Sequence, residues 1–509
     1  MTVALSYLDE NEDWPTHGTY EYSEHYPSRQ QIHTTLPSET YDYIVIGAGP
    51  IGAALAFKLS TDHPHHSILV VEKSWLEPDR IVGELMQPAG CQALELLGLG
   101  KAFSGIGAVP AHGYYISYGG KQLYVPYPLN KRSQRPYRGV SFHHGRFVMN
   151  LRAACKARDN ITCLEASVAE LIGDRTANGM LTAVKGVRIE DIVVKARQAT
   201  FVCDGISSQF RRALNAEPIT TISHFCGLVL THDAIVSNAQ FSKPAGAILN
   251  PPLSDTPNGN PLPMPHNGHV LLDGLGPVLL YQMSERETRV LADLPGPTLP
   301  SDGSQLRALI RESLSRAAPK SQYPQLHSQL MAAVDSPSQR LRCIGSKFIP
   351  ATSNRINGAV WIGDALNVRH PLTGAGMTVG LWDIVHFTEA LKTEQGSLAR
   401  ATARWQWQRR PRALVLNALS VALHALFAAG DSPDMCLLRE ACFVYLARGS
   451  VYTMHPSGFL SGLRASPVLL VVHFFGVAFV AVSMRLSDTK AGSLPMRCIL
   501  ALQLLWAAA

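Results

Sequence analysis

The feature that most constrains this fold is an apolar stretch that runs into three spaced glycines, Asp42–Gly52. Gly47, Gly49 and Gly52 have the spacing Gly-x-Gly-x-x-Gly, and the small-residue stretch Ala53–Leu59 follows them. This pattern predicts a strand, a tight turn and a helix whose N-terminal N–H groups bind a pyrophosphate. The first glycine permits the turn, the second lets a ligand approach the backbone, and the third lets helix and strand pack closely.

A second apolar strand, Ile68–Val71, ends in Glu72. In a dinucleotide-binding unit, an acidic residue at this distance from the glycines accepts hydrogen bonds from the ribose hydroxyls. The glycines alone also fit a strand–helix turn without a ligand. The two features together predict a dinucleotide site.

Composition bounds the rest of the chain. With 509 residues it is too long for one core, so two or three domains are expected. Charged residues make up only 17% and hydrophobic residues 46%, and the apolar excess lies beyond Ala413, which predicts a membrane-associated end. The formal charge of +6 is spread without basic runs interleaved with aromatics, so nucleic acid is excluded and mild attraction to anionic lipid is favoured.

The nine cysteines are scattered without Cys-x-x-Cys or metal-ligand spacing, and we expect them all to be reduced core thiols of a cytosol-facing protein. His143 and His144 predict no metal site, because adjacent side chains on a strand point in opposite directions and no third ligand is suitably spaced. Residues 1–40 are polar and acidic, lack a signal peptide and are expected to form a mobile arm.

Periodicity and turn residues place the remaining elements. Helices are expected at Gly90–Leu97, at His143–Ala154 and within Pro300–Ser336, and Pro251–His269 is expected to be an irregular loop. Strands are expected at Gly113–Tyr118 and Gln122–Val125, which form a hairpin, and at Gly227–Leu230, Val270–Leu272, Val278–Gln282 and Arg289–Ala292.

Two further strand-and-turn segments, Thr200–Ser208 and Gly358–Ala365, carry Asp204 and Asp364. A helix is expected to begin just after the second of them, beyond two glycines at 374 and 376. The free N–H groups at such a helix end stabilise an anion, and a reduced flavin is one.

The C-terminal part contains a basic and aromatic segment, Trp405–Arg412, followed by the apolar stretches Ala413–Ala429, Val468–Met484 and Cys498–Ala509. The 17 residues of Val468–Met484 would span about 25 Å as a helix, less than the roughly 30 Å of a bilayer core. This favours a helix hairpin embedded in one leaflet, while a tilted span and a buried soluble helix stay open.

The glycine motif with Glu72, the Cys203–Gly205 turn, and Gly363–Asp364 with Pro371–Met377 together resemble the group A flavoprotein monooxygenases. Within that group the chain is similar to the squalene epoxidase (squalene monooxygenase) family from about Tyr41 to Met484. The stretches that carry the similarity are Glu77–Glu84, His143–Phe147, Ser284–Val290, Arg369–Gly374, Ala441–Phe443 and His473–Phe475.

The resemblance implies an α/β fold of the hydroxybenzoate hydroxylase type. It comprises a Rossmann-like FAD-binding domain (41–106, 141–220 and 340–395), a β-sheet substrate domain (107–140 and 221–339) and a C-terminal apolar helical membrane region (396–509). In FAD binding, Pro50 and Ile51 would meet the pyrophosphate, and Glu72 the adenosine ribose with Lys73 beside it. Further contacts would come from Arg80 and Arg146, the Val168 backbone at the adenine, Asp204, Asp364 at the ribityl chain, and Gly376 and Met377 at the flavin's pyrimidine edge.

Gln87 and Tyr114 match a hydrogen-bonded pair near the flavin in this family and are the candidate catalytic residues, although Tyr114 alone also fits an ordinary strand tyrosine. Two departures stand out. Ala375 replaces one of three glycines usual in the family, and an N-terminal membrane span, as in some animal relatives, is not expected.

The implied activity is insertion of one oxygen atom of O2 into the terminal alkene of squalene, giving (S)-2,3-oxidosqualene for sterol or triterpenoid biosynthesis through a flavin hydroperoxide. NADPH would supply electrons through NADPH–cytochrome P450 reductase, and direct NADPH binding near Asp204 stays open. The implied location is the cytosolic side of the endoplasmic reticulum (microsomal) membrane or a lipid droplet, with membrane lipid as a partner.

A C30 hydrocarbon must be held by buried area, at roughly 25 cal/mol per Å², and we expect a long apolar tunnel. The candidate wall residues are Leu423, Phe427, Phe443 and Phe474. Two alternatives remain: a sister monooxygenase that acts on another polyprenyl or terpenoid alkene, and a non-catalytic FAD protein that binds lipid.

Overall fold

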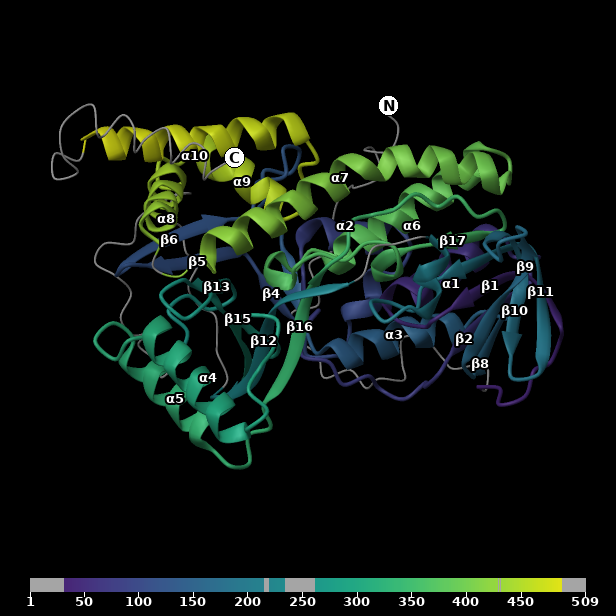
Figure 1. Cartoon of the computed structure of the whole chain (residues 1–509), viewed down its shortest axis with the longest axis horizontal. Helices are drawn as coiled ribbons and strands as arrows, with labels where there is room; N and C mark the ends of the chain where they lie inside the picture. The colour runs from purple at the N-terminus through teal and green to yellow at the C-terminus, as the bar shows by residue number, and fades with distance from the viewer. Residues whose placement is uncertain (1–31, 215–218, 234–260, 429, 431, 488–509) are drawn as a thin grey trace.

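The computed structural model describes residues 32–214, 219–233, 261–428, 430 and 432–487. Two seven-stranded sheets lie side by side, and a layer of helices from the C-terminal part of the chain covers one face of both (Figure 1). A small three-stranded sheet joins β3 (Leu85–Met86), β7 (Gly139–Ser141) and β4 (Val109–Ala111).

The first sheet has the order β8-β2-β1-β11-β10-β9, with β17 paired to β11. Its strands are β1 (Thr40–Ile46), β2 (Ile68–Glu72), β8 (Ile161–Glu165), β9 (Val168–Arg175), β10 (Leu181–Ile189), β11 (Ile192–Val202) and β17 (Ala359–Trp361). β1, β2, β8, β11 and β17 are parallel, so their carboxyl ends meet at one edge. The predicted strand–turn–helix is confirmed: β1 is continuous with the turn at Gly47 and with α1 (Pro50–Asp62).

Helices α1, α3 (His144–Lys156) and α6 (Gly376–Thr393) form a layer beside this sheet, and α2 (Pro88–Leu96) packs on α6. Apolar residues on the inner faces of these helices share one core with β1, β2 and β11. The segment 209–214, which follows the turn at Asp204, forms a 3-10 helix.

The second sheet has the order β16-β12-β15-β14-β13-β5-β6. Its strands are β5 (Gly113–Tyr118), β6 (Lys121–Pro126), β12 (Thr220–Thr231), β13 (Gly268–Leu271), β14 (Val278–Gln282), β15 (Glu287–Pro295) and β16 (Arg342–Phe348). The predicted β5–β6 hairpin is confirmed, and both of its turn glycines have positive φ. β16 belongs to this sheet, although its residues fall within the range 340–395 that was predicted for the FAD-binding domain.

Helices α4 (Gly303–Ala317) and α5 (Pro324–Asp335) pack on the second sheet and close its own core. The predicted loop Pro251–His269 lies outside the described residues up to position 260, and β13 begins at Gly268. Most of the predicted mobile arm also lies outside them. His33, in the described part, pairs with β8.

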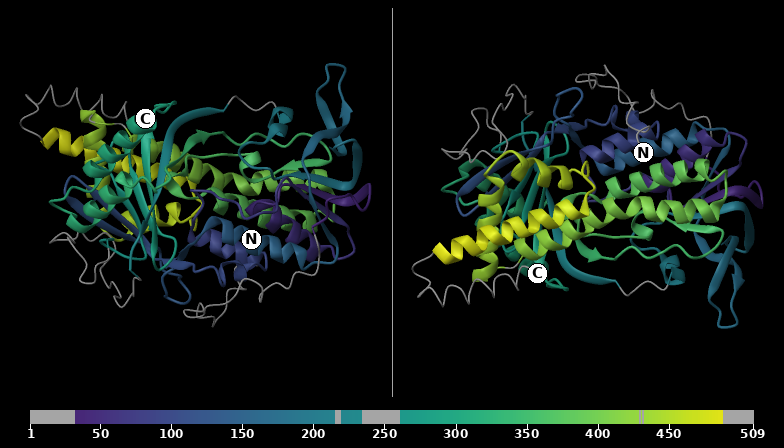
Figure 2. Two further views of the ribbon diagram at one scale, coloured as in Figure 1. Left: turned by 90° about the horizontal axis from the view of Figure 1, so that it is seen from below. Right: turned by 90° about the horizontal axis from the view of Figure 1, so that it is seen from above.

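The C-terminal layer contains α7 (Leu398–Phe427), α8 (Pro433–Leu446), α9 (Val451–Leu460) and α10 (Pro467–Ser487). The basic segment at 405–412 and the apolar stretch after it form one continuous 30-residue helix, α7, with Pro411 inside. Figure 2 shows α7 and α10 running nearly end to end across one face of the molecule.

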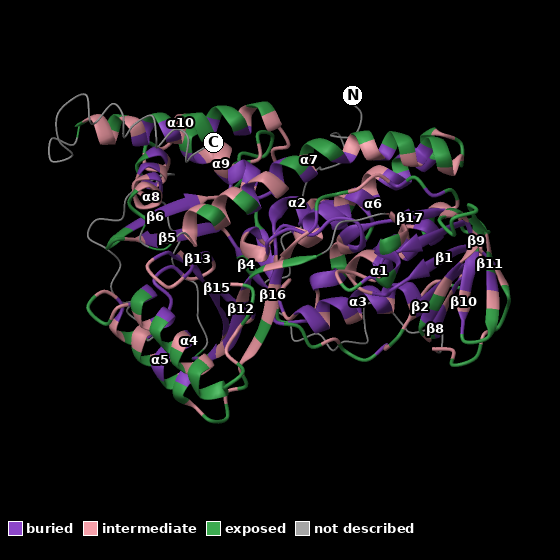
Figure 3. Cartoon of the chain, in the orientation of Figure 1, coloured by how far each residue is buried: buried purple, intermediate pink, exposed green. Residues whose placement is uncertain are grey.

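Helix α10 is long and apolar enough to cross a membrane, being 21 residues or about 31 Å in length. Only 28% of the most apolar 18-residue stretch of α10 is buried inside the protein, and the outer face of the helix is largely exposed (Figure 3). The exposed large apolar residues on it are Val468, Val471, Val472, Phe474, Phe475 and Phe479. The predicted second apolar stretch, Cys498–Ala509, lies outside the described residues.

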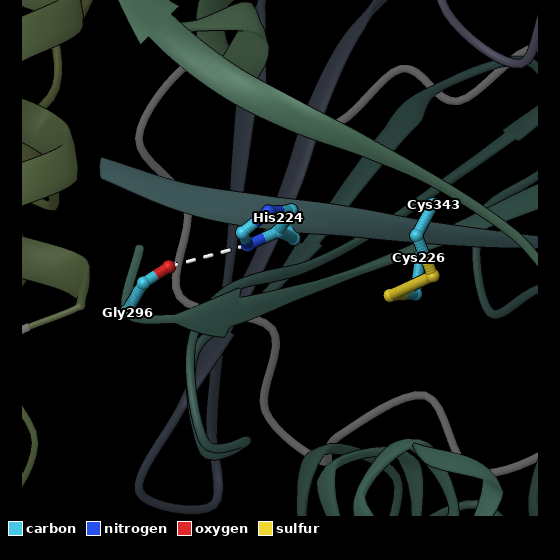
Figure 4. The surroundings of a disulfide bond; sticks show 4 residues. All are labelled: His224, Cys226, Gly296 and Cys343. Atoms are coloured by element: carbon cyan, nitrogen blue, oxygen red, sulfur yellow. Dashed lines mark hydrogen bonds between the residues drawn. A yellow bond between two sulfur atoms is a disulfide. The ribbon is translucent and has the colours of Figure 1, made fainter. Parts of the chain in front are cut away.

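The expectation that every cysteine is a reduced thiol is wrong for one pair. Cys226 on β12 and Cys343 on β16 form a disulfide (Figure 4). They are direct cross-strand partners with Cα atoms 4.2 Å apart, a register that spacing along the chain could not reveal. Cys91, Cys155, Cys163 and Cys203 are buried free thiols, as expected.

Candidate functional site

One cavity of about 530 Å³ brings together the separate motifs of the sequence. Glu72 and Asp364, which lie almost 300 positions apart in the chain, both line it. The predicted site residues in its wall are Gly47, Gly49, Pro50, Ile51, Glu72, Lys73, Arg80, Gln87, Tyr114, Asp204, Asp364, Gly376 and Met377. The cavity lies where the carboxyl edge of the first sheet faces the second sheet, the expected place for a ligand in a parallel α/β sheet.

The three glycines have the local geometry that their spacing predicted. Gly47 has φ +97°, and a Cβ there would lie 2.7 Å from the carbonyl oxygen of Cys203. A Cβ on Gly52 would collide with the carbonyl oxygen of Gly47, so this glycine lets the helix pack closely against the turn. We call the segment Gly47–Gly52 the glycine cradle. A Cβ on Gly49 would meet no atom within 4 Å, which leaves the N-terminus of α1 open to an anionic ligand.

Glu72 is held at the end of β2 by backbone and by a buried arginine. Its Oε2 accepts a 2.7 Å hydrogen bond from Ala48 N–H, and Arg152 Nη2 lies 3.7 Å away. Arg152 also donates to the carbonyl oxygens of Ala48 and Leu76. Burial lowers the pKa of Arg152, and the charge of Glu72 opposes that shift. The sequence reasoning missed Arg152, whose only signal is an arginine amid the apolar residues of α3.

The two acidic turns meet through Arg211, which donates to the carbonyl oxygens of Gly205 and Asp364 at 3.2 and 2.7 Å. Burial raises the pKa of Asp364, and the charges of Arg369, Arg80 and Arg211 oppose that rise. Asp204 Oδ1 is buried and has no hydrogen-bond partner within the described part of the chain. A bound group with hydroxyl or N–H donors would satisfy it.

Ala375, the departure from the family's three glycines, does not line the cavity. It is buried in a small cluster with Val379 on α6 and with Ala413 and Leu416 on α7. The extra methyl group is therefore accommodated by helix packing and does not narrow this cavity.

Tyr114 and Gln87 form the hydrogen bond that the resemblance implied. Tyr114 Oη donates to Gln87 Oε1 at 2.8 Å, and Gln87 Nε2 donates to the carbonyl oxygen of Thr373 at 3.1 Å. Tyr127, which was not predicted, donates to the same Oε1 at 2.9 Å. Burial raises the pKa of Tyr114, so its hydroxyl stays protonated at neutral pH.

A buried ion pair fixes the segment that carries Arg80 and Gln87. Glu84 accepts two hydrogen bonds of 2.8 Å from Arg289 on β15, and Tyr281 on β14 donates to it at 3.1 Å. These contacts tie a loop of the first half of the site to the second sheet.

The four residues predicted for the tunnel wall do not line this cavity. No residue of α7 to α10 lines the cavity, and its apolar wall comes from the second sheet and the adjoining loops: Val82, Leu85, Val270, Leu279, Leu291 and Leu372. Phe443 packs in one cluster with Tyr114, which lines the cavity. Leu423 and Phe427 are half-buried on α7, and Phe474 is 38% exposed on α10.

Two other predicted cofactor residues are also outside the cavity wall. Arg146 Nη1 lies 3.4 Å from the carbonyl oxygen of Ile106, and the Val168 carbonyl accepts a hydrogen bond from Gln209.

Asp293, His370 and His424 bring three possible metal ligands within 4.8 Å of one another. The imidazole rings, however, lie 4.0 Å apart at only 30° to each other, so their lone pairs run side by side and do not converge on one ion. His370 Nδ1 also accepts a hydrogen bond from Leu372 N–H, which leaves the ring proton on Nε2. The ring arrangement is therefore not that of a metal centre: His424 Nε2 lies 3.2 Å from Asp293 Oδ2, and His370 Nε2 lies 3.0 Å from Ser223 Oγ. His143 and His144 contact different partners, Glu287 and the Gly83 carbonyl.

The fold defines the class of protein first. Solved structures similar to this one include p-nitrophenol 4-monooxygenase from Pseudomonas putida (TM-score 0.62, 15% identity, 84% of this chain and all of that one). Another is PqsL from P. aeruginosa (TM-score 0.58, 19% identity, 76% of this chain and 97% of that one). The architecture is therefore that of the flavin-dependent monooxygenases.

The family follows from sequence. The model of the squalene epoxidase family matches residues 196–244 and 256–499. The squalene epoxidase of Schizosaccharomyces pombe is 35% identical over 91% of this chain and 95% of its own length. The squalene monooxygenase of Mus musculus is 36% identical over 86% of this chain and 71% of its own length. The chain belongs to the squalene epoxidase family.

Proposed function

We propose that this protein is an FAD-dependent squalene epoxidase that inserts one oxygen atom of O2 into the terminal alkene of squalene to give 2,3-oxidosqualene. The observation that carries the proposal is the composition of a single cavity. It joins a glycine cradle and two acidic turns to a buried tyrosine–glutamine pair and a wall of aliphatic side chains.

The residues present fit FAD. The open N-terminus of α1 suits a pyrophosphate, Glu72 suits ribose hydroxyls, and the unpartnered Asp204 Oδ1 calls for a donor from a ligand. Arg80 supplies a cation in the same wall, whereas Arg146 and Val168 would need to act from behind it. When bound and reduced, FAD supplies the activation of oxygen.

The chain's own contribution is to position the reactants and exclude water. An alkene has no proton to remove, so the site needs no general base. The Tyr114 hydroxyl stays protonated and donates a hydrogen bond to Gln87 Oε1, and Gln87 Nε2 donates one to the carbonyl oxygen of Thr373. Leu85, Leu279 and Leu291 offer the apolar contact area by which a hydrocarbon is bound.

Electrons and substrate would come from a membrane. The sequence has one dinucleotide fingerprint, Gly47–Gly52, which supports reduction by NADPH through NADPH–cytochrome P450 reductase. The exposed apolar face of α10 supports attachment to the endoplasmic reticulum membrane or a lipid droplet, where squalene dissolves. If α10 spans the membrane, residues 488–509 become accessible on the far side of the membrane. If α10 lies in the plane of the membrane, they do not.

The test supplies the detergent-purified protein with NADPH, the reductase, O2 and either squalene or a panel of other polyprenyl alkenes. The proposal expects 2,3-oxidosqualene as the main product. Preferential epoxidation of another alkene would indicate a sister monooxygenase, and no oxygen-dependent product would indicate a non-catalytic flavoprotein.

A further inference from the structure

Arg369 is a buried cation in the cavity wall that the sequence reasoning did not assign. It is 6% exposed, and Nη1 lies 3.4 Å from the carbonyl oxygens of Ala375 and Gly376. A Cβ added to Gly376 would be 4.0 Å from both Arg369 Nη1 and Asp364 Oδ1. The guanidinium and the carboxylate therefore flank Gly376, a position at the start of α6 where the wall carries no side chain.

Two amide side chains hold one edge of this guanidinium. Arg369 Nε donates to Asn417 Oδ1 at 2.9 Å, and Nη2 donates to Asn367 Oδ1 at 2.6 Å. Asn417 Nδ2 closes the triangle at 3.3 Å from Asn367 Oδ1. These short hydrogen bonds occupy Nε and Nη2. Nη1 makes only two long contacts, so it is the nitrogen that can bind a ligand.

Asn417 belongs to α7, which lies beside α6 (Figure 1). Ala413 and Leu416, which precede Asn417 on α7, pack against Ala375 and Val379 at the start of α6. Farther along α7, His424 Nε2 lies 3.2 Å from Asp293 Oδ2, beside His370. Helix α7 thus contacts the segment 367–375 at three levels, and this segment contributes Arg369, Leu372 and Thr373 to the cavity wall.

We propose that α7 is an integral part of the flavin site, because Asn417 positions the Arg369 guanidinium at the end of the cavity where α6 begins. This inference rests on the proposed function and deepens it. A protonated guanidinium beside a flavin stabilises the anionic reduced form more than the neutral oxidised form. Asn417 acts through Arg369 and is a positioning residue. Burial lowers the pKa of Arg369 to about 10, which still leaves it charged at neutral pH.

The test replaces Asn417 with leucine in the full-length protein in detergent. FAD affinity is measured from flavin fluorescence, and the midpoint potential from a spectroelectrochemical titration. The leucine variant removes the acceptor for Arg369 Nε. We expect it to bind oxidised FAD about tenfold more weakly than the wild type does, and its loss of affinity for reduced FAD should be larger by about a further tenfold. That additional tenfold corresponds to a midpoint potential lower by about 30 mV for a two-electron couple.

Gln406→Leu is the matched control on the same helix. Gln406 exchanges hydrogen bonds of 2.9 and 3.2 Å with the Asn354 backbone and does not line the cavity. We expect it to lower thermal stability but to keep the wild-type FAD affinity and potential. An equal fall in potential in this control would overturn the proposal.

Asn417→Asp guards against a leucine variant that fails to fold. It keeps an acceptor for Arg369 Nε, so it should bind FAD, but its charge offsets the guanidinium and should lower the potential below the wild-type value. Wild-type affinity and potential in both Asn417 variants, or in the aspartate variant alone if the leucine variant does not fold, would overturn the proposal. A wild-type protein that binds no FAD would instead refute the proposed function.

Discussion

The buried ion pair between Glu84 and Arg289 allows a quantitative prediction. Glu84 is 2% exposed and accepts two 2.8 Å hydrogen bonds from Arg289 and one of 3.1 Å from Tyr281. Burial disfavours the charge of Arg289, but the hydrogen bonds to Glu84 and its negative charge outweigh that effect and raise the pKa of Arg289. Replacing Arg289 with methionine would leave the Glu84 carboxylate buried without a cation. The expected loss is about 3–5 kcal/mol in the free energy of unfolding.

Removing both charges should cost much less than removing one. In the double variant Glu84→Gln, Arg289→Met, the neutral amide can still accept from Tyr281, and no buried charge remains. We expect it to recover about 2 kcal/mol or more of the single-variant loss. The assay is urea unfolding of the wild-type protein, the two single variants and the double variant in one detergent. FAD affinity is measured alongside, because the loop that carries Glu84 also carries Arg80 and Gln87. Additive losses, or an unchanged Arg289→Met variant, would refute the reasoning.

Three further predictions concern the site, acid stability and the membrane helix. The Tyr114→Phe variant should bind FAD normally but have turnover lower by about tenfold. The Tyr127→Phe variant should lose less turnover, because Tyr127 does not line the cavity. A larger loss of turnover in Tyr127→Phe than in Tyr114→Phe would contradict this. Burial lowers the pKa of several histidines to about 4, namely those of His112, His144, His269, His370 and His386. Their stabilising contribution is therefore complete above the unfolded pKa of about 6.5 and is lost as the pH falls from there towards 4. The thermal midpoint of unfolding should be lower at about pH 5 than at about pH 7.5. An equal midpoint at both pH values would contradict this prediction. Deleting the residues after Ala465 removes α10 and should preserve FAD binding while abolishing turnover of squalene in vesicles; turnover equal to that of the full chain would count against a delivery role.

The nucleotide cradle was predictable because it depends on local chemistry. Glycine spacing, two apolar strands and a terminal acidic residue fix β1, α1 and β2, and parallel pairing then brings Glu72 and Asp204 to one edge. The β5–β6 hairpin was predictable for the same reason, since Gly119 and Gly120 provide its turn.

Contacts that depend on register or on packing between distant segments were not predictable. The Cys226–Cys343 disulfide follows from the pairing of β12 with β16, two strands separated by more than 100 residues. Asn417 reaches Arg369 only because α7 folds back over α6, and the apolar sequence after residue 413 suggested a membrane segment. The substrate wall predicted at Leu423 and Phe427 stays a prediction: these residues do not line the cavity, whose aliphatic wall comes from the second sheet and the loops beside it.

The most direct test of the central claim follows the fate of oxygen in the wild-type protein. Purified protein is incubated with squalene, NADPH, the reductase and 18O2, and both the flavin spectrum and the mass of the product are recorded. We predict a bound oxidised flavin that is bleached on reduction, and 2,3-oxidosqualene that carries one 18O atom. A protein without flavin, or a flavoprotein that consumes NADPH but leaves squalene unlabelled, would contradict it.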